Sequence, residues 1–410
     1  MGVDRCEREC HRGLLGGAAG QRRARNAPHR PPSRPGGGVS GAQERIPLAK
    51  PVIGDREREL VDEVLRSGQL SLGPMVPRFE RAWAERIGVK HAVAVSSGTA
   101  GLHLCLHALG LGPGDEVITS SFSFVASANA ILFTGATPVF AEVDPLTFNM
   151  DPAAVEAAIT PRTKAILIVD IFGYPAEVPA LVAIAERHGL ARVEDACQSI
   201  DGSYDGRKLG TFGHPAVYGF YANKQLTTAE GGVVLTDDDE LAKVLSSLRN
   251  QGRSDDGAWL VHSRLGFNYR LSDVHSAIGV AQLERLTDML DGRARVAAWY
   301  QERVAGIDGV TPMYEGPQKR SWFVYAPRLD PRFDRDDVIG RLDALGISSK
   351  PYLPCIHLQP YYQDEHGHGP GEFPVTEAIS ASTIALPFFP EMTESQVDQV
   401  CEALATVLGA

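Results

Sequence analysis

Residues 91–144 read HAVAVSSGTAGLHLCLHALGLGPGDEVITSSFSFVASANAILFTGATPVFAEVD, and this stretch decides the fold. Short apolar runs, which are typical of buried strands, alternate with longer runs whose apolar residues fall on one helical face. Such alternation predicts parallel βαβ units, and therefore an α/β domain of three layers with helices on both faces of its sheet. The expected strands lie at residues 91–96, 115–120 and 137–144, and the expected helices at 99–110 and 124–135.

The same alternation continues towards the C-terminus. Further strands are expected at residues 164–173, 190–196, 217–221 and 231–237, and further helices at 151–159, 177–189 and 239–252. One long helical stretch, residues 274–305, then leads into a part with less regular alternation. We therefore expect a large domain at residues 46–290 and a smaller α+β domain at residues 291–410.

Composition excludes several classes of protein. The chain has 410 residues and a formal net charge of −11, which argues against a nucleic-acid partner, because phosphate attraction needs a basic face. No apolar run approaches the roughly 18 residues of a membrane span. The six cysteines are mostly far apart, which is no disulfide framework and indicates a reducing, cytoplasmic location.

Residues 1–45 differ from the rest of the chain. They hold nine arginines against four acidic residues, and they show no apolar periodicity. A disordered N-terminal extension is expected from this composition. Without a long apolar run it does not resemble a secretory signal. A transit peptide or an over-extended translation start would each explain it, and we favour the second.

Two polar groups follow expected strands, where open α/β sheets bind ligands. The first is SSGTAG at residues 96–101, which opens a helix whose free N–H groups suit a phosphate. Its alternative interpretation is an ordinary helix cap. The second is Asp195, a carboxylate that is costly to bury without a cationic partner. Its alternative role is a structural hydrogen bond.

A third group is Lys224, in AVYGFYANKQLTTAEGGVVLTD at residues 216–237. Most lysines are solvated surface amines. A phosphate cradle, a buried aspartate and a lysine together match the three needs of pyridoxal 5′-phosphate, which has a phosphate, a ring nitrogen and an aldehyde. In a desolvated pocket the pKa of the lysine would fall, and its amine would become a competent base.

Several ordered motifs carry a family resemblance. They are IPLAKPVIGDREREL, SSGTAGLHL, GDEVITSSFSFVASANAILFTGATPVFAEVD, VEDACQS, NKQLTTAEGG, LGFNYRLSD and PYLPCIHLQPYY. From residue 46 onwards, the chain resembles the DegT/DnrJ/EryC1/StrS aminotransferases. The resemblance implies a fold-type I transferase that aminates a nucleotide-linked keto-deoxy sugar, with L-glutamate as donor, for amino-sugar, polysaccharide or glycoside biosynthesis.

The resemblance implies roles for five residues around the cofactor. Lys224 would bind the aldehyde covalently and act as the catalytic base. Asp195 would pair with the ring nitrogen, and Gln198 would lie near the ring hydroxyl. Thr99 and Ala100 would bind the phosphate, largely through their backbone N–H groups.

Five more residues follow from the same resemblance. Phe124 would stack on the cofactor ring, and core packing is its alternative role. Asn268 would reach the phosphate from a neighbouring subunit, which implies a homodimer with shared active sites. Tyr269 and Arg270 would line the same cleft or serve the structure. His357 would contact the substrate or have a non-catalytic role.

Two positions depart from the family pattern. Gly219 stands where many members have a serine that contributes a hydroxyl to the phosphate, which places that contact in doubt. Asp170 stands where many members have histidine, and we assign it no function. The loop DEHGHGPGE at residues 364–372 has no fixed ligand geometry, so no metal is expected.

Two other functions stay open at this point. One is amination of a cyclitol ketone, an inosose, which related members perform. The other is a catalytically silent regulator that keeps the scaffold. The presence of both Lys224 and Asp195 argues against the regulator, because a silent scaffold needs neither.

Overall fold

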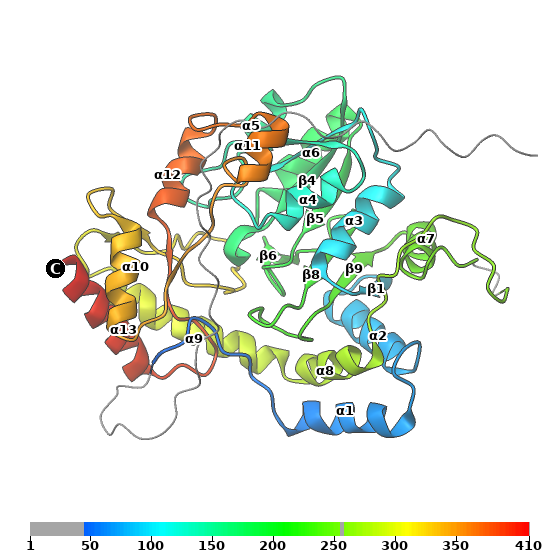
Figure 1. Ribbon diagram of the computed structural model, residues 1–410, viewed down its shortest axis with the longest axis horizontal. Helices are drawn as coiled ribbons and strands as arrows, with labels where there is room; N and C mark the ends of the chain where they lie inside the picture. The colour runs from blue at the N-terminus through cyan, green and yellow to red at the C-terminus, as the bar shows by residue number, and fades with distance from the viewer. Residues whose placement is uncertain (1–44, 255–257, 410) are drawn as a thin grey trace, which may run out of the picture. The chain divides into compact units, whose positions relative to one another are not determined.

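The computed structural model describes residues 45–254 and 258–409, whose helices and strands are labelled in Figure 1. The expected N-terminal extension lies outside the described residues except for Arg45. The chain from Glu44 to Ala410 forms one compact unit. Within the described part of the chain, no helix is long and apolar enough to cross a bilayer.

A seven-stranded sheet lies at the centre of this unit, in the order β1-β9-β8-β5-β4-β2-β3. Its strands are β1 (His91–Val95), β2 (Glu116–Ser120), β3 (Thr137–Ala141), β4 (Thr163–Val169), β5 (Ala191–Asp195), β8 (Ala216–Gly219) and β9 (Gly232–Thr236). Strand β9 runs antiparallel to β1 and β8, and the remaining neighbours pair in parallel. The predicted α/β class with a mostly parallel sheet is confirmed.

The direction of β9 has a simple cause. A parallel connection needs a crossover of a dozen or more residues, usually with a helix. Only a loop without a helix joins β8 to β9, so the chain turns back beside the strand that it has just left.

Helices cover both faces of the sheet. On one face, α3 (Gly98–Ala108) packs its apolar residues against strand residues such as Val95 and Leu167. On the other face, α2 (Met75–Ile87) and α8 (Asp273–Glu284) cover β1, β8 and β9, where Trp83 stacks on Tyr218 at 5.4 Å between ring centroids. The helices α5 (Pro152–Ala157) and α6 (Val178–His188) cover β2 and β4. The three predicted layers are therefore present.

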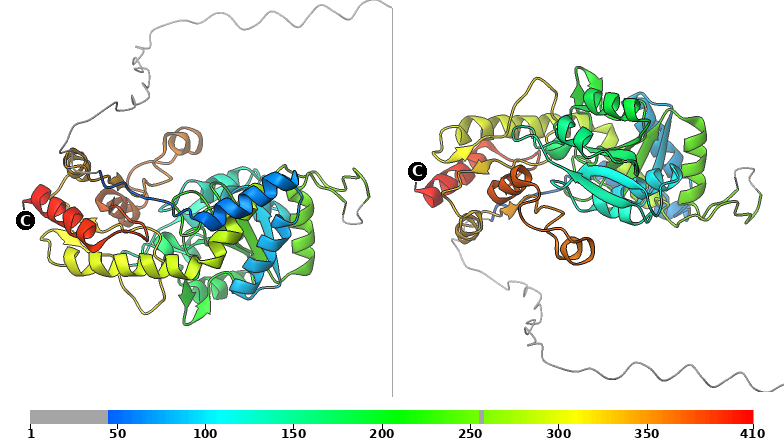
Figure 2. Two further views of the ribbon diagram at one scale, coloured as in Figure 1. Left: turned by 90° about the horizontal axis from the view of Figure 1, so that it is seen from below. Right: turned by 90° about the horizontal axis from the view of Figure 1, so that it is seen from above.

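Further helices surround these layers. Helix α1 (Asp55–Ser67) lies along α8, as Figure 2 shows. The others near the sheet are α4 (Ala126–Leu132), which is shorter than expected, and α7 (Asp239–Arg249).

The expected long helix at residues 274–305 is two helices, α8 and α9 (Leu286–Val304). The backbone leaves the helical conformation at Arg285, where φ is −122° and ψ is 14°. Helix α9 contains the expected domain boundary at residues 290/291 and continues without interruption into the C-terminal part.

The C-terminal part contains four more helices and two small strand pairs. They are α10 (Arg335–Ala344), α11 (Pro360–His366), α12 (Pro374–Ser382) and α13 (Glu394–Leu408), with β10 (Val310–Thr311) paired to β11 (Arg328–Leu329) and β12 (Lys350–Pro351) paired to β13 (Ile384–Ala385).

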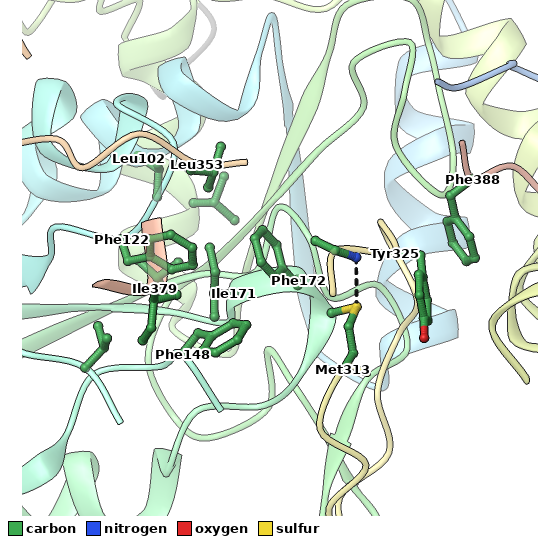
Figure 3. Packing of buried hydrophobic residues seen from close by; sticks show 14 of the residues in the cluster. Leu102, Phe122, Phe148, Ile171, Phe172, Met313, Tyr325, Leu353, Ile379 and Phe388 are labelled. Carbon is green, nitrogen blue, oxygen red and sulfur yellow. Dashed lines mark hydrogen bonds between the residues drawn. The ribbon is translucent and has the colours of Figure 1, made fainter. Parts of the chain in front are cut away.

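The hydrophobic core continues from the sheet into this part. Figure 3 shows Phe122 and Phe172 in the same cluster as Leu353, Ile379 and Phe388. The rings of Phe122 and Phe172 meet edge to face, 5.6 Å between centroids. Because the two parts share one core, the loops of the C-terminal part are held against the carboxyl ends of the strands.

Candidate functional site

The candidate site lies at the carboxyl ends of β5 and β8. These strands are parallel neighbours, and Asp195, the last residue of β5, pairs in register with Val217 of β8. Lys224 follows five residues after Gly219, the end of β8. The parallel pairing therefore brings the aspartate and the lysine loop, which lie 29 positions apart in the sequence, to one edge of the sheet.

The loop after β8 is closed by its own side chains. The hydroxyl of Thr227 donates to the carbonyl of Phe220 at 3.1 Å, and the hydroxyl of Thr228 donates to the carbonyl of Glu230 at 2.8 Å. The backbone N–H of Lys224 donates to Tyr221 at 2.9 Å. These local bonds explain why two threonines follow the lysine, since they fix the backbone that carries it.

Lys224 itself is partly buried, and its Nζ lies 4.1 Å from the centroid of the Phe323 ring. No described residue forms a hydrogen bond or an ion pair with this nitrogen. Burial is the largest influence on the pKa of Lys224 and lowers it; Cys197 and Asp195 raise it, and the charge of Arg293 lowers it again. The amine of Lys224 therefore has no hydrogen-bond or ion-pair partner among the described residues, and its pKa lies below the ordinary value for lysine.

Asp195 is buried, with 7% of its surface exposed. Its Oδ2 accepts a hydrogen bond from the Ser127 hydroxyl at 2.7 Å, and its Oδ1 accepts one from the backbone N–H of Cys197 at 3.2 Å. Both donors are neutral, and among residues 45–254 and 258–409 no ion pair satisfies this carboxylate. A cation on a ligand would complete the arrangement.

The N-terminus of α3 faces the same edge of the sheet. Ser97 caps this helix, because its hydroxyl accepts a hydrogen bond from the Ala100 N–H at 3.0 Å. The N–H groups of Gly98 and Thr99 have no partner in the described part of the chain. The capping interpretation is thus confirmed for Ser97, while two N–H groups of the first turn stay open to an anion.

Close backbone packing holds this helix end in place. A Cβ on Gly232 would lie 2.8 Å from Gly98 N, and a Cβ on Gly98 would lie 2.8 Å from the Cys197 sulfur. A Cβ on Gly219 would lie 3.1 Å from the same Cys197 sulfur. Cys197 therefore occupies the space beside Gly219, the position at which many members of the DegT/DnrJ/EryC1/StrS family have a serine.

Gln198 is buried, and its Oε1 accepts the Phe172 N–H at 2.9 Å. No described residue forms a hydrogen bond with its amide nitrogen, so this donor stays open to a ligand. Phe124 is 59% exposed and borders a cavity of about 450 Å³ together with Leu353 and Tyr361. The core-packing role considered for Phe124 is therefore wrong, and its ring is free to stack on a ligand.

Three expected residues lie on the segment that returns from α7. Asn268 is exposed and pairs with Asn250 in an isolated bridge. The Tyr269 hydroxyl lies 3.2 Å from His103 Nδ1, and Arg270 donates to the Asn250 side chain at 3.0 Å. Within one subunit Tyr269 and Arg270 have structural partners, whereas Asn268 is open to a neighbouring molecule.

His357 is fully buried, and both of its ring nitrogens have partners. Nδ1 lies 2.6 Å from the Ser121 hydroxyl, and Nε2 lies 3.2 Å from Glu377. This geometry favours the non-catalytic alternative, in which His357 anchors its loop beside β2.

Asp170 has a comparable structural role. Its side chain is buried and accepts hydrogen bonds from the Ala176 N–H at 2.9 Å and the Ser199 hydroxyl at 3.3 Å.

Sequence reasoning missed Ser127, Phe323 and Arg293. Ser127 lies within an expected helix with no mark that distinguishes it. Phe323 and Arg293 come from the C-terminal part and from α9, and no local pattern connects either of them with Lys224.

These residues fit pyridoxal 5′-phosphate. The open N–H groups of Gly98 and Thr99 suit its phosphate. The Asp195 carboxylate, which has no cationic partner among the described residues, suits a protonated ring nitrogen. The Lys224 amine, which no described residue hydrogen-bonds, suits its aldehyde.

Comparison with known proteins also indicates an enzyme that uses pyridoxal 5′-phosphate. The model of the DegT/DnrJ/EryC1/StrS aminotransferase family matches residues 51–405. The spore coat polysaccharide biosynthesis protein SpsC of Bacillus subtilis is 39% identical over 377 residues, which cover 88% of this chain and 97% of SpsC. GDP-perosamine synthase of Caulobacter vibrioides is 39% identical over 369 residues, which cover 89% and 98%. The crystal structure of DesV from S. venezuelae superimposes with a TM-score of 0.83 at 35% identity and covers 89% of this chain and 98% of DesV.

Proposed function

The chain belongs to the DegT/DnrJ/EryC1/StrS aminotransferase family, and from this premise we propose that it transfers an amino group from L-glutamate to a nucleotide-linked keto-deoxy sugar. It is a sugar aminotransferase, and its cofactor is pyridoxal 5′-phosphate. Two relatives that align over nearly their whole length support the sugar nucleotide, because one is named for a GDP-linked amino sugar and the other for polysaccharide biosynthesis.

The observation that carries the proposal is that Asp195 and Lys224 lie at one edge of the sheet and that neither has an ion-pair partner among the described residues. When bound, pyridoxal 5′-phosphate supplies an aldehyde with which an amine can condense and a ring that takes up the electron pair of a broken C–H bond. Lys224 would hold the cofactor through that aldehyde, and its Nζ would serve as the base for the α-proton of glutamate, a role that its lowered pKa favours.

The remaining residues bind and orient. Asp195 would accept a hydrogen bond from the protonated ring nitrogen and keep that nitrogen charged. Gln198 would donate its amide N–H to the ring hydroxyl, and Phe124 would cover the ring. The open N–H groups of Gly98 and Thr99 in the first turn of α3 would hold the phosphate, whereas the N–H of Ala100, for which the same role was expected, already donates to Ser97.

A second copy of the chain completes the site. Asn268 contributes to the phosphate of the neighbouring subunit in a homodimer with shared active sites. Its exposure in the single chain supports this assignment.

Product analysis tests the substrate. The purified protein, loaded with cofactor, is incubated with glutamate and with a panel of nucleotide keto-deoxy sugars and inososes, and the products are identified by mass spectrometry. We expect an aminated nucleotide sugar and 2-oxoglutarate. Amination of an inosose alone would replace the proposal with the cyclitol function.

The Lys224→Ala variant tests the site. It should yield no product and no borohydride-fixed cofactor, whereas the wild-type protein should carry that adduct on the peptide containing Lys224. Near-normal turnover by the variant would overturn the role of the lysine.

A further inference from the structure

Arg293, on α9, is a buried cation without a counterion. Its surface is 3% exposed, and no acidic residue in the described part of the chain forms an ion pair with it. Its Nη1 donates to the carbonyl of Phe323 at 3.0 Å, and its Nη2 donates to the carbonyl of Lys224 at 3.1 Å. Burying an unpaired guanidinium is costly, so this residue needs an explanation beyond packing.

The two carbonyls belong to residues whose side chains face each other. Lys224 Nζ lies 4.1 Å from the centroid of the Phe323 ring. One planar guanidinium thus joins the backbones of both members of this contact, with the fork geometry that only arginine offers. A second hydrogen bond links the same two segments, because the Nε2 of Gln225 donates to the Ser321 hydroxyl at 3.0 Å.

The positive charge of Arg293 also lowers the pKa of the Lys224 amine. The groups that influence Lys224 are Cys197 and Asp195 from the end of β5 and Arg293 from α9. Burial lowers the pKa of Arg293 to about 10, so it stays charged at neutral pH. Arg293 is the one cation in this set, and it opposes protonation of the neighbouring amine.

We propose that Arg293 is the positioning residue of the catalytic lysine: it clamps the Lys224 backbone to Phe323 and places an uncompensated positive charge beside the amine. The inference rests on the proposed role of Lys224. It assigns α9 a function in catalysis although Arg293 touches neither substrate nor cofactor in this role.

The chain supplies a matched control in Arg320. This guanidinium also donates to two backbone carbonyls, those of Phe172 and Tyr314, both at 3.0 Å, and its pKa is likewise lowered by burial to about 10. It forms no bond to Lys224 and is not among the groups that influence the lysine pKa. Loss of Arg320 therefore also removes two hydrogen bonds to backbone carbonyls, but without the effect on the amine.

The test compares Arg293→Met, Arg293→Lys and Arg320→Met in the full chain. The protonation midpoint of Lys224 is measured in the cofactor-free protein from the pH dependence of its labelling by trace acetic anhydride, followed by peptide mass spectrometry. Turnover of the cofactor-loaded protein is measured in parallel.

Arg293→Met should raise the Lys224 midpoint and lower kcat by about tenfold to a hundredfold, the range expected when a reacting group is displaced. Arg293→Lys keeps the charge but loses the fork, so the midpoint should stay near that of the wild type while kcat still falls. Arg320→Met should leave the midpoint unchanged.

An unchanged midpoint and unchanged kcat in Arg293→Met would overturn the inference, as would an equal midpoint shift in Arg320→Met. If Arg293→Met does not fold, full kcat in Arg293→Lys overturns the positioning role by itself. Failure of the proposed function is separate, because it would show as the absence of a borohydride-fixed adduct on Lys224 in the wild-type protein.

Discussion

At the scale of single residues, the site depends on Asp195 and Lys224, neither of which forms an ion pair with a residue that the structure describes. The known partners of the Asp195 carboxylate are neutral donors, Ser127 and the Cys197 backbone. Lys224 faces an aromatic ring instead of an acid. Each group alone is unfavourable to bury, and together they are complementary to one bound molecule that carries a protonated nitrogen and an aldehyde.

Asp195→Asn keeps the size of the side chain and removes its charge. Because the ring nitrogen would lose its anionic partner, the rate of the glutamate half-reaction should fall by about 10²-fold or more. Single-turnover absorbance of the bound cofactor after mixing with glutamate measures this rate. Ser127→Ala, which leaves the carboxylate in place, is the control and should have a smaller effect; equal rates for Asp195→Asn and the wild type would exclude the assigned role.

The lowered pKa of Lys224 predicts the sign of a pH dependence. The amine must be unprotonated to accept the α-proton, so kcat should rise with pH through the lowered pKa and then level off. The midpoint should lie below 10.5, the ordinary value for lysine. A kcat profile whose acid limb has its midpoint at or above that value would contradict the assignment.

At the scale of elements, the decisive feature is how closely α3 approaches the sheet. Gly98 and Gly232 allow backbone to meet backbone, which aims the first turn of the helix at the ends of β5 and β8. Ser97 satisfies one N–H of that turn and leaves others for an anion. Parallel strands supply the common edge, and the closed loop after β8 supplies a fixed direction for the lysine.

Gly232→Ala tests this packing. The added Cβ would meet Gly98 N and Ser97 at 2.8 Å, so the variant should lose about 1–3 kcal/mol of unfolding free energy and bind the cofactor more weakly. Thermal unfolding and cofactor titration measure the two effects. Gly340→Ala is the control, because no atom lies within 4 Å of its new Cβ and a helical glycine replaced by alanine should gain about 0.5–1 kcal/mol. Unchanged stability and cofactor affinity in Gly232→Ala would show that α3 is not held as described.

At the scale of the whole molecule, residues 258–268, which include Asn268, expose apolar side chains. Trp259 is 83% exposed, and Leu265 is 84% exposed. Exposed apolar groups of this size typically mark an interaction surface. The proposed homodimer would cover them and would bring Asn268 to the neighbouring site.

Leu265→Glu should therefore shift the protein from dimer towards monomer and lower its cofactor content, since a buried carboxylate would oppose assembly. Sedimentation equilibrium and cofactor absorbance are the measurements. Leu345→Glu, at an exposed apolar position in the C-terminal part, should change neither. A wild-type monomer with full activity, or a fully dimeric and active Leu265→Glu variant, would contradict the proposed assembly.

The sequence by itself determined the three layers and most of the strand positions, and it singled out the groups for which we propose cofactor binding. Buried strands such as β4 appear as continuous apolar runs, and a lysine, an aspartate and a helix start at strand ends are local signals. The family motifs are also contiguous, which is why the resemblance could be found without coordinates. A local sequence pattern shows which residues are buried and how apolar residues repeat, because neighbouring residues belong to one strand or helix.

Only the tertiary structure decided which distant groups meet. It made β9 antiparallel, exposed Phe124, buried His357 with two partners and placed Arg293 on the carbonyl of Lys224, 69 positions away in the sequence. Such contacts depend on how α9 and the C-terminal loops pack against the sheet. Packing over long sequence separation leaves no periodic trace in either segment, so no local pattern could have predicted these contacts.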